Sequence, residues 1–216
     1  GINFIDTADC YGRAEEFIGE HLSHRRSEYT LATKCGCILT GGKEWASENL
    51  LTGLERSLKR MKTDHVDVMQ LHGATVEDCE KGGLVETLQM MNQEGKVRWI
   101  GASTHAEQVG AFIDTGAFDL INASVHLLNP SAGVKPHGMQ VEQDWDGILA
   151  YAAAQGVGAA IYSPLAGGFL NDNAVSGGDP HPLGLGARNE EEGERIQRQI
   201  GAFAFLSKNL NPDDQP

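Results

Sequence analysis

The sequence lacks any long apolar run and is poor in basic residues. No stretch approaches the roughly 20 consecutive apolar residues of a membrane-spanning helix, so we expect a soluble, cytoplasmic protein without a membrane partner. The 17 lysines and arginines stand against 30 acidic residues, which gives a formal charge of -13. A strongly acidic balance argues against nucleic acid as a partner.

Cysteine is also scarce. The four cysteines stand at positions 10, 35, 37 and 79, which fits neither a disulfide framework nor the ligand spacing of a zinc knuckle. We therefore expect reduced thiols and no metal. A metal site at Cys35 and Cys37 remains the alternative, but no second pair of ligands stands at a matching spacing.

Six strand-like apolar runs alternate with segments of helical periodicity. Strands are expected at 1–6, 29–34, 66–72, 97–103, 118–122 and 157–162. Helices are expected at 14–23, 47–61, 84–91, 105–114, 142–155 and 196–206. The alternation implies parallel strands joined by right-handed crossovers, either in a doubly wound sheet or in a barrel.

A glycine-rich turn after the first strand is missing. A doubly wound dinucleotide-binding sheet needs such a turn next to the phosphates, but Gly12 is the only glycine between residues 2 and 18. This absence favours an α/β fold of the (β/α)8 type, a TIM barrel. We expect one domain over residues 1–216, because this length fits a single core.

Titratable side chains stand at the ends of three successive predicted strands. Asp6 ends the first strand and Tyr11 follows it, while Lys34 ends the second strand and His72 the third. Taken alone, Asp6 is more simply a turn cap and Tyr11 a packed aromatic residue. In a barrel these strand ends meet at one mouth, however, so the four groups would share a pocket.

These residue types fit the delivery of a proton to an oxygen that gains negative charge. Tyrosine is a weak acid at neutral pH, and a nearby lysine ammonium is expected to lower the pKa of Tyr11. We predict Tyr11 as the general acid and Lys34 with Asp6 as the pair that tunes it. His72 is predicted to position a carbonyl oxygen. The set contains no source of hydride and no metal, so a reduction needs another electron donor.

Other polar and aromatic residues have simpler explanations. His126 and His137 are expected to be solvated loop residues, and Trp99 is expected to lie in the core. Trp45 either lines the substrate pocket or packs against the start of the next helix. A catalytic role of the Cys10 thiol is not expected, because no base is adjacent in the pattern.

Five stretches resemble the aldo-keto reductase superfamily in order and spacing, and its bacterial oxidoreductase-like members most of all. They are residues 1–12, 32–34, 67–72, 100–103 and 162–168. The resemblance implies a (β/α)8 barrel that reduces aldehydes and ketones without metal, using a nicotinamide cofactor that is usually NADPH, with NADH as the second option. The catalytic residues of the family fall on Asp6, Tyr11, Lys34 and His72.

The same resemblance implies a set of cofactor-binding residues. The serine and asparagine that hold the nicotinamide carboxamide in the family fall on Ser103 and Thr104, and a glutamine on the next strand falls on Asn122. Tyr162 matches the aromatic residue that stacks on the nicotinamide ring. The loop over the pyrophosphate corresponds to Ser163, Pro164, Leu165 and Gly167.

The resemblance also implies an incomplete barrel. In the family, one strand and helix precede the phrase that opens this sequence, and another pair carries the basic loop for the adenosine 2′-phosphate. We therefore expect a fragment with about six of eight units. Two functions stay open: a reductase of small aldehydes or ketones, and a regulatory or inactive barrel that binds cofactor with little turnover, as channel-associated relatives do. Substrate identity, cofactor preference and oligomeric state are not predicted.

Overall fold

The computed structural model describes residues 1–36, 45–134, 141, 143–171 and 190–208. The chain divides into two compact units, Gly1–Ala123 with Ile148–Ala160 and Ser124–Gly147 with Ile161–Pro216. Two residues of the sequence predictions, Cys37 and His137, lie outside the described residues.

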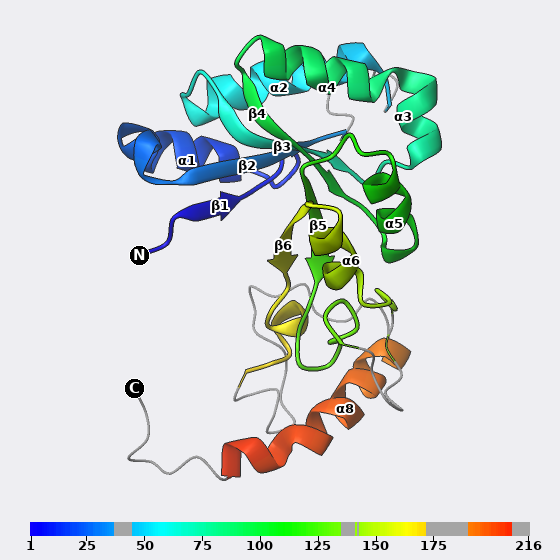
Figure 1. The fold of residues 1–216 in the computed structure, drawn as a ribbon. Coiled ribbons are helices and arrows are strands. Elements are labelled where there is room, and N and C mark those ends of the chain that lie inside the picture. The colour runs from blue at the N-terminus through cyan, green and yellow to red at the C-terminus, as the bar shows by residue number, and fades with distance from the viewer. Residues whose placement is uncertain (37–44, 135–140, 142, 172–189, 209–216) are drawn as a thin grey trace. The chain divides into compact units, whose positions relative to one another are not determined.

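Six strands form a sheet in which neighbours in space are neighbours in the sequence (Figure 1). The strands are β1 Phe4–Asp6, β2 Thr30–Cys35, β3 Val66–His72, β4 Val97–Ser103, β5 Leu120–Ser124 and β6 Gly158–Tyr162. Strands β1 to β5 pair in parallel. A doubly wound sheet would reverse its strand order at one point, so the consecutive order confirms the incomplete (β/α)8 barrel.

Helices connect the strands, as the alternation predicts. The α-helices are α1 Ala14–His21, α2 Ser47–Met61, α3 Val76–Gly82, α4 Leu84–Gln93, α5 Ala106–Asp114, α6 Ile148–Ala154 and α8 Glu190–Lys208. Two short 3-10 helices are η1 Ser23–Glu28 and η2 Ala166–Gly168. In the described part of the chain, no helix combines the length and the apolar character needed to cross a membrane.

Two helices differ from the sequence prediction. The helix expected over 142–155 begins only at Ile148, because Asp146 and Gly147 have φ values of 45° and 71°. A right-handed helix does not allow these values. Helix α3 has no predicted counterpart, although Thr75 and Asp78 form a capping box whose spacing is visible in the sequence.

The main hydrophobic core lies between the sheet and the helices α2 and α4, which Figure 1 shows along the same side of β3 and β4. Helix α2 buries one face because Leu50, Leu54 and Leu58 recur every four residues. The largest fully buried apolar side chains of this core are Leu31, Leu50, Leu54, Met61, Met69, Leu71, Leu84, Leu88, Met91 and Phe112.

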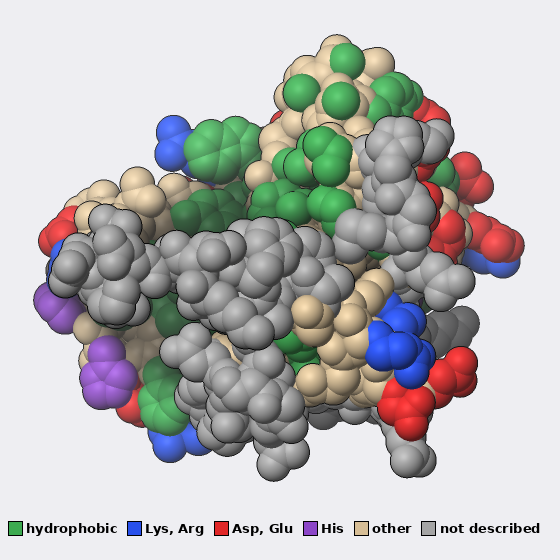
Figure 2. All heavy atoms as spheres, turned by 90° about the horizontal axis from the view of Figure 1, so that it is seen from below, with side chains coloured by type: hydrophobic (Ala, Val, Ile, Leu, Met, Phe, Trp, Pro, Cys, Tyr) green, Lys and Arg blue, Asp and Glu red, His purple; other side chains and the backbone are tan. Residues whose placement is uncertain are grey.

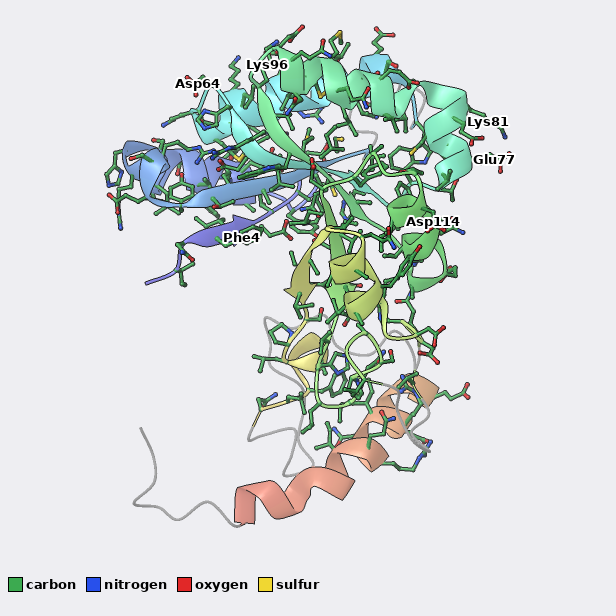
Figure 3. The ribbon with its side chains drawn as sticks, in the orientation of Figure 1. Phe4, Asp64, Glu77, Lys81, Lys96 and Asp114 are labelled. Carbon is green, nitrogen blue, oxygen red and sulfur yellow. The ribbon has the colours of Figure 1, made fainter. Side chains whose placement is uncertain are left out.

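Large apolar side chains are exposed at the two edge strands. They include Phe4 on β1 (labelled in Figure 3) and Ile161 on β6, and Figure 2 shows further hydrophobic side chains at the surface. Trp99 is also 39% exposed, so the prediction that it lies in the core is wrong. Its indole lines an open cavity of about 290 Å³ together with Phe4 and Val68.

Exposed ion pairs lie on the helices or next to them. Lys81 pairs with Glu77 on α3, and Lys96 Nζ lies 2.7 Å from Glu55 Oε1; Figure 3 labels Glu77 and both lysines. All four side chains are more than one third exposed. Exposed pairs contribute at most about 1 kcal/mol each, so packing of the core contributes more to stability than these pairs do.

The contact between α1 and α2 allows a test of this packing. A Cβ atom at Gly19 would lie 2.1 Å from the carbonyl oxygen of Arg60, so the two helix backbones touch. We expect Gly19→Ala to lower the free energy of unfolding by about 2 kcal/mol, because the helices must separate. Urea denaturation followed by circular dichroism measures this change.

Gly110→Ala on α5 is the matched control. A Cβ atom at Gly110 meets no atom within 4 Å, and alanine forms helix better than glycine by about 1 kcal/mol. Unchanged or higher stability is therefore expected for Gly110→Ala. A Gly19→Ala variant as stable as the control would show that the two helices are not in contact at this point.

Candidate active site

Lys34, near the carboxyl end of β2, carries a buried charge. Its side chain is 2% exposed, and Nζ donates to Asp6 Oδ2 at 2.6 Å and to the carbonyl oxygen of Thr7 at 2.7 Å. Without these acceptors, a buried ammonium would cost several kcal/mol. Burial lowers the pKa of Lys34, and the Asp6 carboxylate opposes this shift.

Both oxygens of the Asp6 carboxylate have partners on other strands. Lys34 on β2 holds Oδ2, and Gln70 Nε2 on β3 donates to Oδ1 at 2.7 Å. The strand register places Lys34 directly beside Gln70, which explains why both side chains reach the same carboxylate. The sequence analysis missed Gln70, because an apolar strand pattern does not reveal which polar residue faces Asp6.

Tyr11 and His72 lie beside this ion pair. Lys34 Nζ is 5.1 Å from the centre of the Tyr11 ring. The ring centres of Tyr11 and His72 are 5.7 Å apart, and the ring planes meet at 80°. The structure therefore brings together all four residues that the strand ends predict, and Tyr11, which is 49% exposed, borders the solvent.

The pKa of Tyr11 differs from the expectation. Burial and the negative charge of Asp6 raise this pKa above its usual value, whereas the sequence analysis expects Lys34 to lower it. Burial is the larger cause of the difference, and Asp6 adds to it because its negative charge offsets the positive charge of Lys34. Tyr11 therefore keeps its proton at neutral pH.

His72 is neutral near pH 7. Burial and the positive charge of Lys34 lower the pKa of its imidazole, and the negative charge of Asp6 opposes them. A neutral imidazole carries one N–H donor and one acceptor nitrogen. His72 can therefore donate a hydrogen bond without first taking up a proton.

Cys10 lies next to His72, with 3.7 Å between Sγ and Nδ1. Cys10 is disulfide-bonded, so the expectation of reduced thiols is wrong at this position. Sequence spacing does not tell which sulfur atoms approach each other in space. Cys35 and Cys79 are free and buried, and burial raises the pKa of Cys79 to about 12, which keeps this thiol protonated.

A buried ionic network fixes the loop between β1 and α1, which carries Tyr11. Arg56 Nη2 donates to Asp9 Oδ2 at 3.2 Å, and Arg60 Nη1 donates to the carbonyl oxygen of Asp9 at 3.0 Å. Arg60 also pairs with Glu15 at 3.2 Å. The helical pattern predicts both arginines on the solvent face of α2, but the buried carboxylates of Asp9 and Glu15 attract them inward.

Ser103 and Asn122 lie together on the neighbouring strands β4 and β5. Asn122 is 2% exposed, and its Nδ2 donates to Ser103 Oγ over a long 3.4 Å. The buried Oδ1 of Asn122 has no hydrogen-bond partner among the described residues. A donor such as a carboxamide NH₂ group would satisfy this oxygen, so the two residues fit a nicotinamide.

Thr104 has a different environment from Ser103 and Asn122. Its hydroxyl donates to the carbonyl oxygen of Ala74 at 2.9 Å, and the residue is 9% exposed. The side chain thus links the end of β4 to the loop after β3. This hydrogen bond engages the hydroxyl hydrogen within the protein.

The other predicted cofactor residues belong to the second compact unit and are described within it. Tyr162 is 38% exposed, and Trp145 packs edge to face against its ring with 6.4 Å between the ring centres. Ser163 has a positive φ of 55°, and its carbonyl oxygen accepts from the Ala166 N–H at 2.9 Å. Within or beside this turn lie Pro164, Leu165 and Gly167.

His126 is not a fully solvated residue, because its Nδ1 is buried without a partner in the described part of the chain. Burial and the positive charge of Arg195 lower its pKa. Trp45 packs over the end of β2, where a Cβ atom on Gly36 would lie 2.4 Å from the indole.

A sequence model described as the aldo/keto reductase family matches residues 1–211. The chain belongs to this family. It is 31% identical over 188 residues to L-galactose dehydrogenase of Arabidopsis thaliana, which covers 80% of this chain and 54% of that protein.

Two further proteins are similar to this chain. A probable voltage-gated potassium channel subunit beta of Oryza sativa subsp. japonica is 30% identical over 198 residues, 83% of this chain and 56% of that protein. The holo form of aldo-keto reductase AKR11C1 from Bacillus halodurans matches all of this chain and 65% of its own, with a TM-score of 0.71 and 26% identity. The chain spans about half the length of these curated relatives.

Asp9 allows a test of the ionic network through pH. Burial raises its pKa from 3.8 to about 6, although the charge of Arg56 opposes the shift. The folded chain thus holds this proton more tightly than the unfolded chain. The protonated Asp9 carboxyl therefore stabilises the folded chain. This stabilisation is complete below pH 3.8 and is lost as the pH rises through about 6.

Asp9→Asn removes this contribution. We expect the stability of the wild type relative to Asp9→Asn to fall by on the order of 3 kcal/mol as the pH rises from about 3.5 to about 7. Urea unfolding at a series of pH values measures it. Glu107→Gln, a change of an exposed carboxyl on α5, serves as the control and should follow the wild type. A constant difference between the wild type and Asp9→Asn would refute the raised pKa.

Proposed function

We propose that the protein reduces aldehyde or ketone carbonyls to alcohols with NADPH, or with NADH in its place. The observation that carries the proposal is the grouping of Asp6, Tyr11, Lys34 and His72 at the carboxyl ends of three successive strands. Membership of the aldo/keto reductase family supports this class of reaction.

Tyr11 is the proposed proton donor. Because burial and Asp6 raise its pKa, the phenol stays protonated until a substrate oxygen takes the proton. Lys34 Nζ, 5.1 Å from the ring centre, stabilises the phenolate that remains. Asp6 and the Thr7 carbonyl oxygen hold the ammonium in place for this role.

His72 is the proposed orienting group. As a neutral imidazole next to Tyr11, it can donate a hydrogen bond to the carbonyl oxygen of the substrate. A donor aimed at the oxygen where negative charge develops lowers the barrier to addition. The nicotinamide supplies the hydride when bound, and Tyr11 and His72 act on the oxygen that becomes the alcohol.

Ser103 and Asn122 are the proposed contacts of the nicotinamide carboxamide, because Asn122 Oδ1 is buried and unpartnered among the described residues. Thr104 is proposed to support them through its bond to Ala74. By resemblance to the family, Tyr162 is proposed to stack on the nicotinamide ring. The proposed pyrophosphate loop comprises Ser163, Pro164, Leu165 and Gly167.

The proposal has two further parts, the kind of partner and the location. A formal charge of -13 disfavours nucleic acid as a partner, and membership of the aldo/keto reductase family supports a small-molecule carbonyl compound as the substrate. We also propose a cytoplasmic location, where reduced nicotinamide cofactors are available to such an enzyme.

Tyr11→Phe tests the proposed acid. In the full-length protein, loss of the phenolic proton should reduce kcat for an aldehyde such as 4-nitrobenzaldehyde by about 100-fold or more, measured as NADPH oxidation at 340 nm. The affinity for NADPH should not change, since the ring remains. Tyr151→Phe makes the same chemical change on α6 and should keep full activity. Equal rates for Tyr11→Phe and the wild type would rule out this mechanism.

A regulatory barrel is the second candidate, and the similarity to a probable potassium channel subunit beta favours it. Such a protein would bind the cofactor but turn over little. Titration of NADPH fluorescence measures binding, and steady-state assays with several aldehydes measure turnover. We expect both binding at micromolar concentrations and turnover; binding without turnover would favour the regulatory candidate.

A further inference from the structure

Gln70 is a fully buried polar residue that lies two positions before His72 on β3. Its exposed fraction is 0%. The register of the sheet sets it directly beside Lys34 on β2 and Gly101 on β4. Gln70 therefore lies beside Lys34, near the carboxyl ends of the strands that carry the proposed catalytic groups.

The amide of Gln70 has one orientation. Asp6 Oδ1 accepts a hydrogen bond from Nε2 at 2.7 Å, and an ionised carboxylate can only accept, so Nε2 must face Asp6. The other amide atom, Oε1, is then turned away and has no partner among the described residues. An apolar side chain of equal length would fill the space without this unsatisfied oxygen, so the packing of the core does not require an amide.

The neighbouring strand leaves room for this side chain. A Cβ atom on Gly101 would lie 2.8 Å from Gln70 Cγ and 3.3 Å from Val68 Cγ1. Gly101 does not have a positive φ, so the reason for a glycine here is space rather than backbone conformation. The absence of a side chain at position 101 allows Gln70 to extend toward Asp6.

We propose that Gln70 is a positioning residue, which holds the Asp6 carboxylate so that Lys34 stays next to Tyr11. With Oδ2 bound by Lys34 and Oδ1 bound by Gln70, the carboxylate cannot rotate about its bond without losing a charge-assisted hydrogen bond. This role rests on the proposed carbonyl reduction. Gln70 acts through Asp6, so its loss should affect proton transfer from Tyr11 and not the affinity for cofactor or substrate.

Gln70→Met and Gln70→Glu test the proposal in the full-length protein. Methionine has a similar length but no donor, so kcat for an aldehyde should fall about tenfold with unchanged KM and unchanged NADPH affinity. Gln108→Met, the same change on helix α5, is the control and should leave kcat unchanged.

Gln70→Glu adds a second readout, the dependence of activity on pH. Two carboxyl groups in contact retain a shared proton at low pH, and that proton can replace the amide donor to Asp6. The activity of Gln70→Glu should therefore approach that of the wild type at acidic pH and fall as the pH rises. Among the described residues, the charged or titratable groups in contact with position 70 or next to it are Asp6, Lys34, Cys35 and, at the end of the same strand, His72. Cys35 Sγ donates to the Gln70 carbonyl oxygen at 3.5 Å. All four groups are the same in the wild type. The ratio of the variant to the wild type thus isolates the new carboxyl.

The outcomes separate the two proposals. A wild type that turns over, together with a Gln70→Met variant of equal kcat and equal pH profile, would overturn the role of Gln70 alone. A ratio of Gln70→Glu to wild type that does not change with pH would overturn it as well, even if Gln70→Met fails to fold. A wild type that binds NADPH but reduces no carbonyl would overturn the proposed function and the role of Gln70 with it.

Discussion

The buried ammonium of Lys34 constrains how the first two strands pair. The acceptors described for it, Asp6 Oδ2 and the Thr7 carbonyl oxygen, both come from the carboxyl end of β1. A shift of one residue between β1 and β2 would turn Asp6 to the other face of the sheet and leave a buried charge without its counterion. The register of the first two strands is therefore fixed by electrostatics as well as by apolar packing.

The loop after β1 is held from two sides. Lys34 binds it from the sheet, while Arg56 and Arg60 bind Asp9 from helix α2. Tyr11 follows Asp9 by two residues, and its ring is half exposed, so the ring itself has little packing to hold it. The hydrogen bonds from Lys34, Arg56 and Arg60 hold the loop on both sides and so fix the position of the exposed Tyr11 phenol.

Much of the fold and the four proposed catalytic residues could be predicted because their signals are local. Each apolar run ends in a polar residue, and parallel strands bring such ends together. Gln70 and Arg56 could not be predicted in this way, since each contacts a residue that is distant in sequence, Asp6 or Asp9. The exposure of Trp99 likewise depends on which side chains surround it. The hydrophobic periodicity of the sequence does not indicate these neighbours.

The consecutive order of the strands also has a consequence for how the site assembles. Every pairing in the sheet joins a strand to the one before it in the sequence, so each contact closes a loop of only one strand-helix unit, and short loops cost little entropy to close. Asp6, Lys34 and His72 come from the first three strands. The proton-transfer groups therefore all lie within one contiguous stretch, residues 6–72, which does not include the strand that carries Asn122.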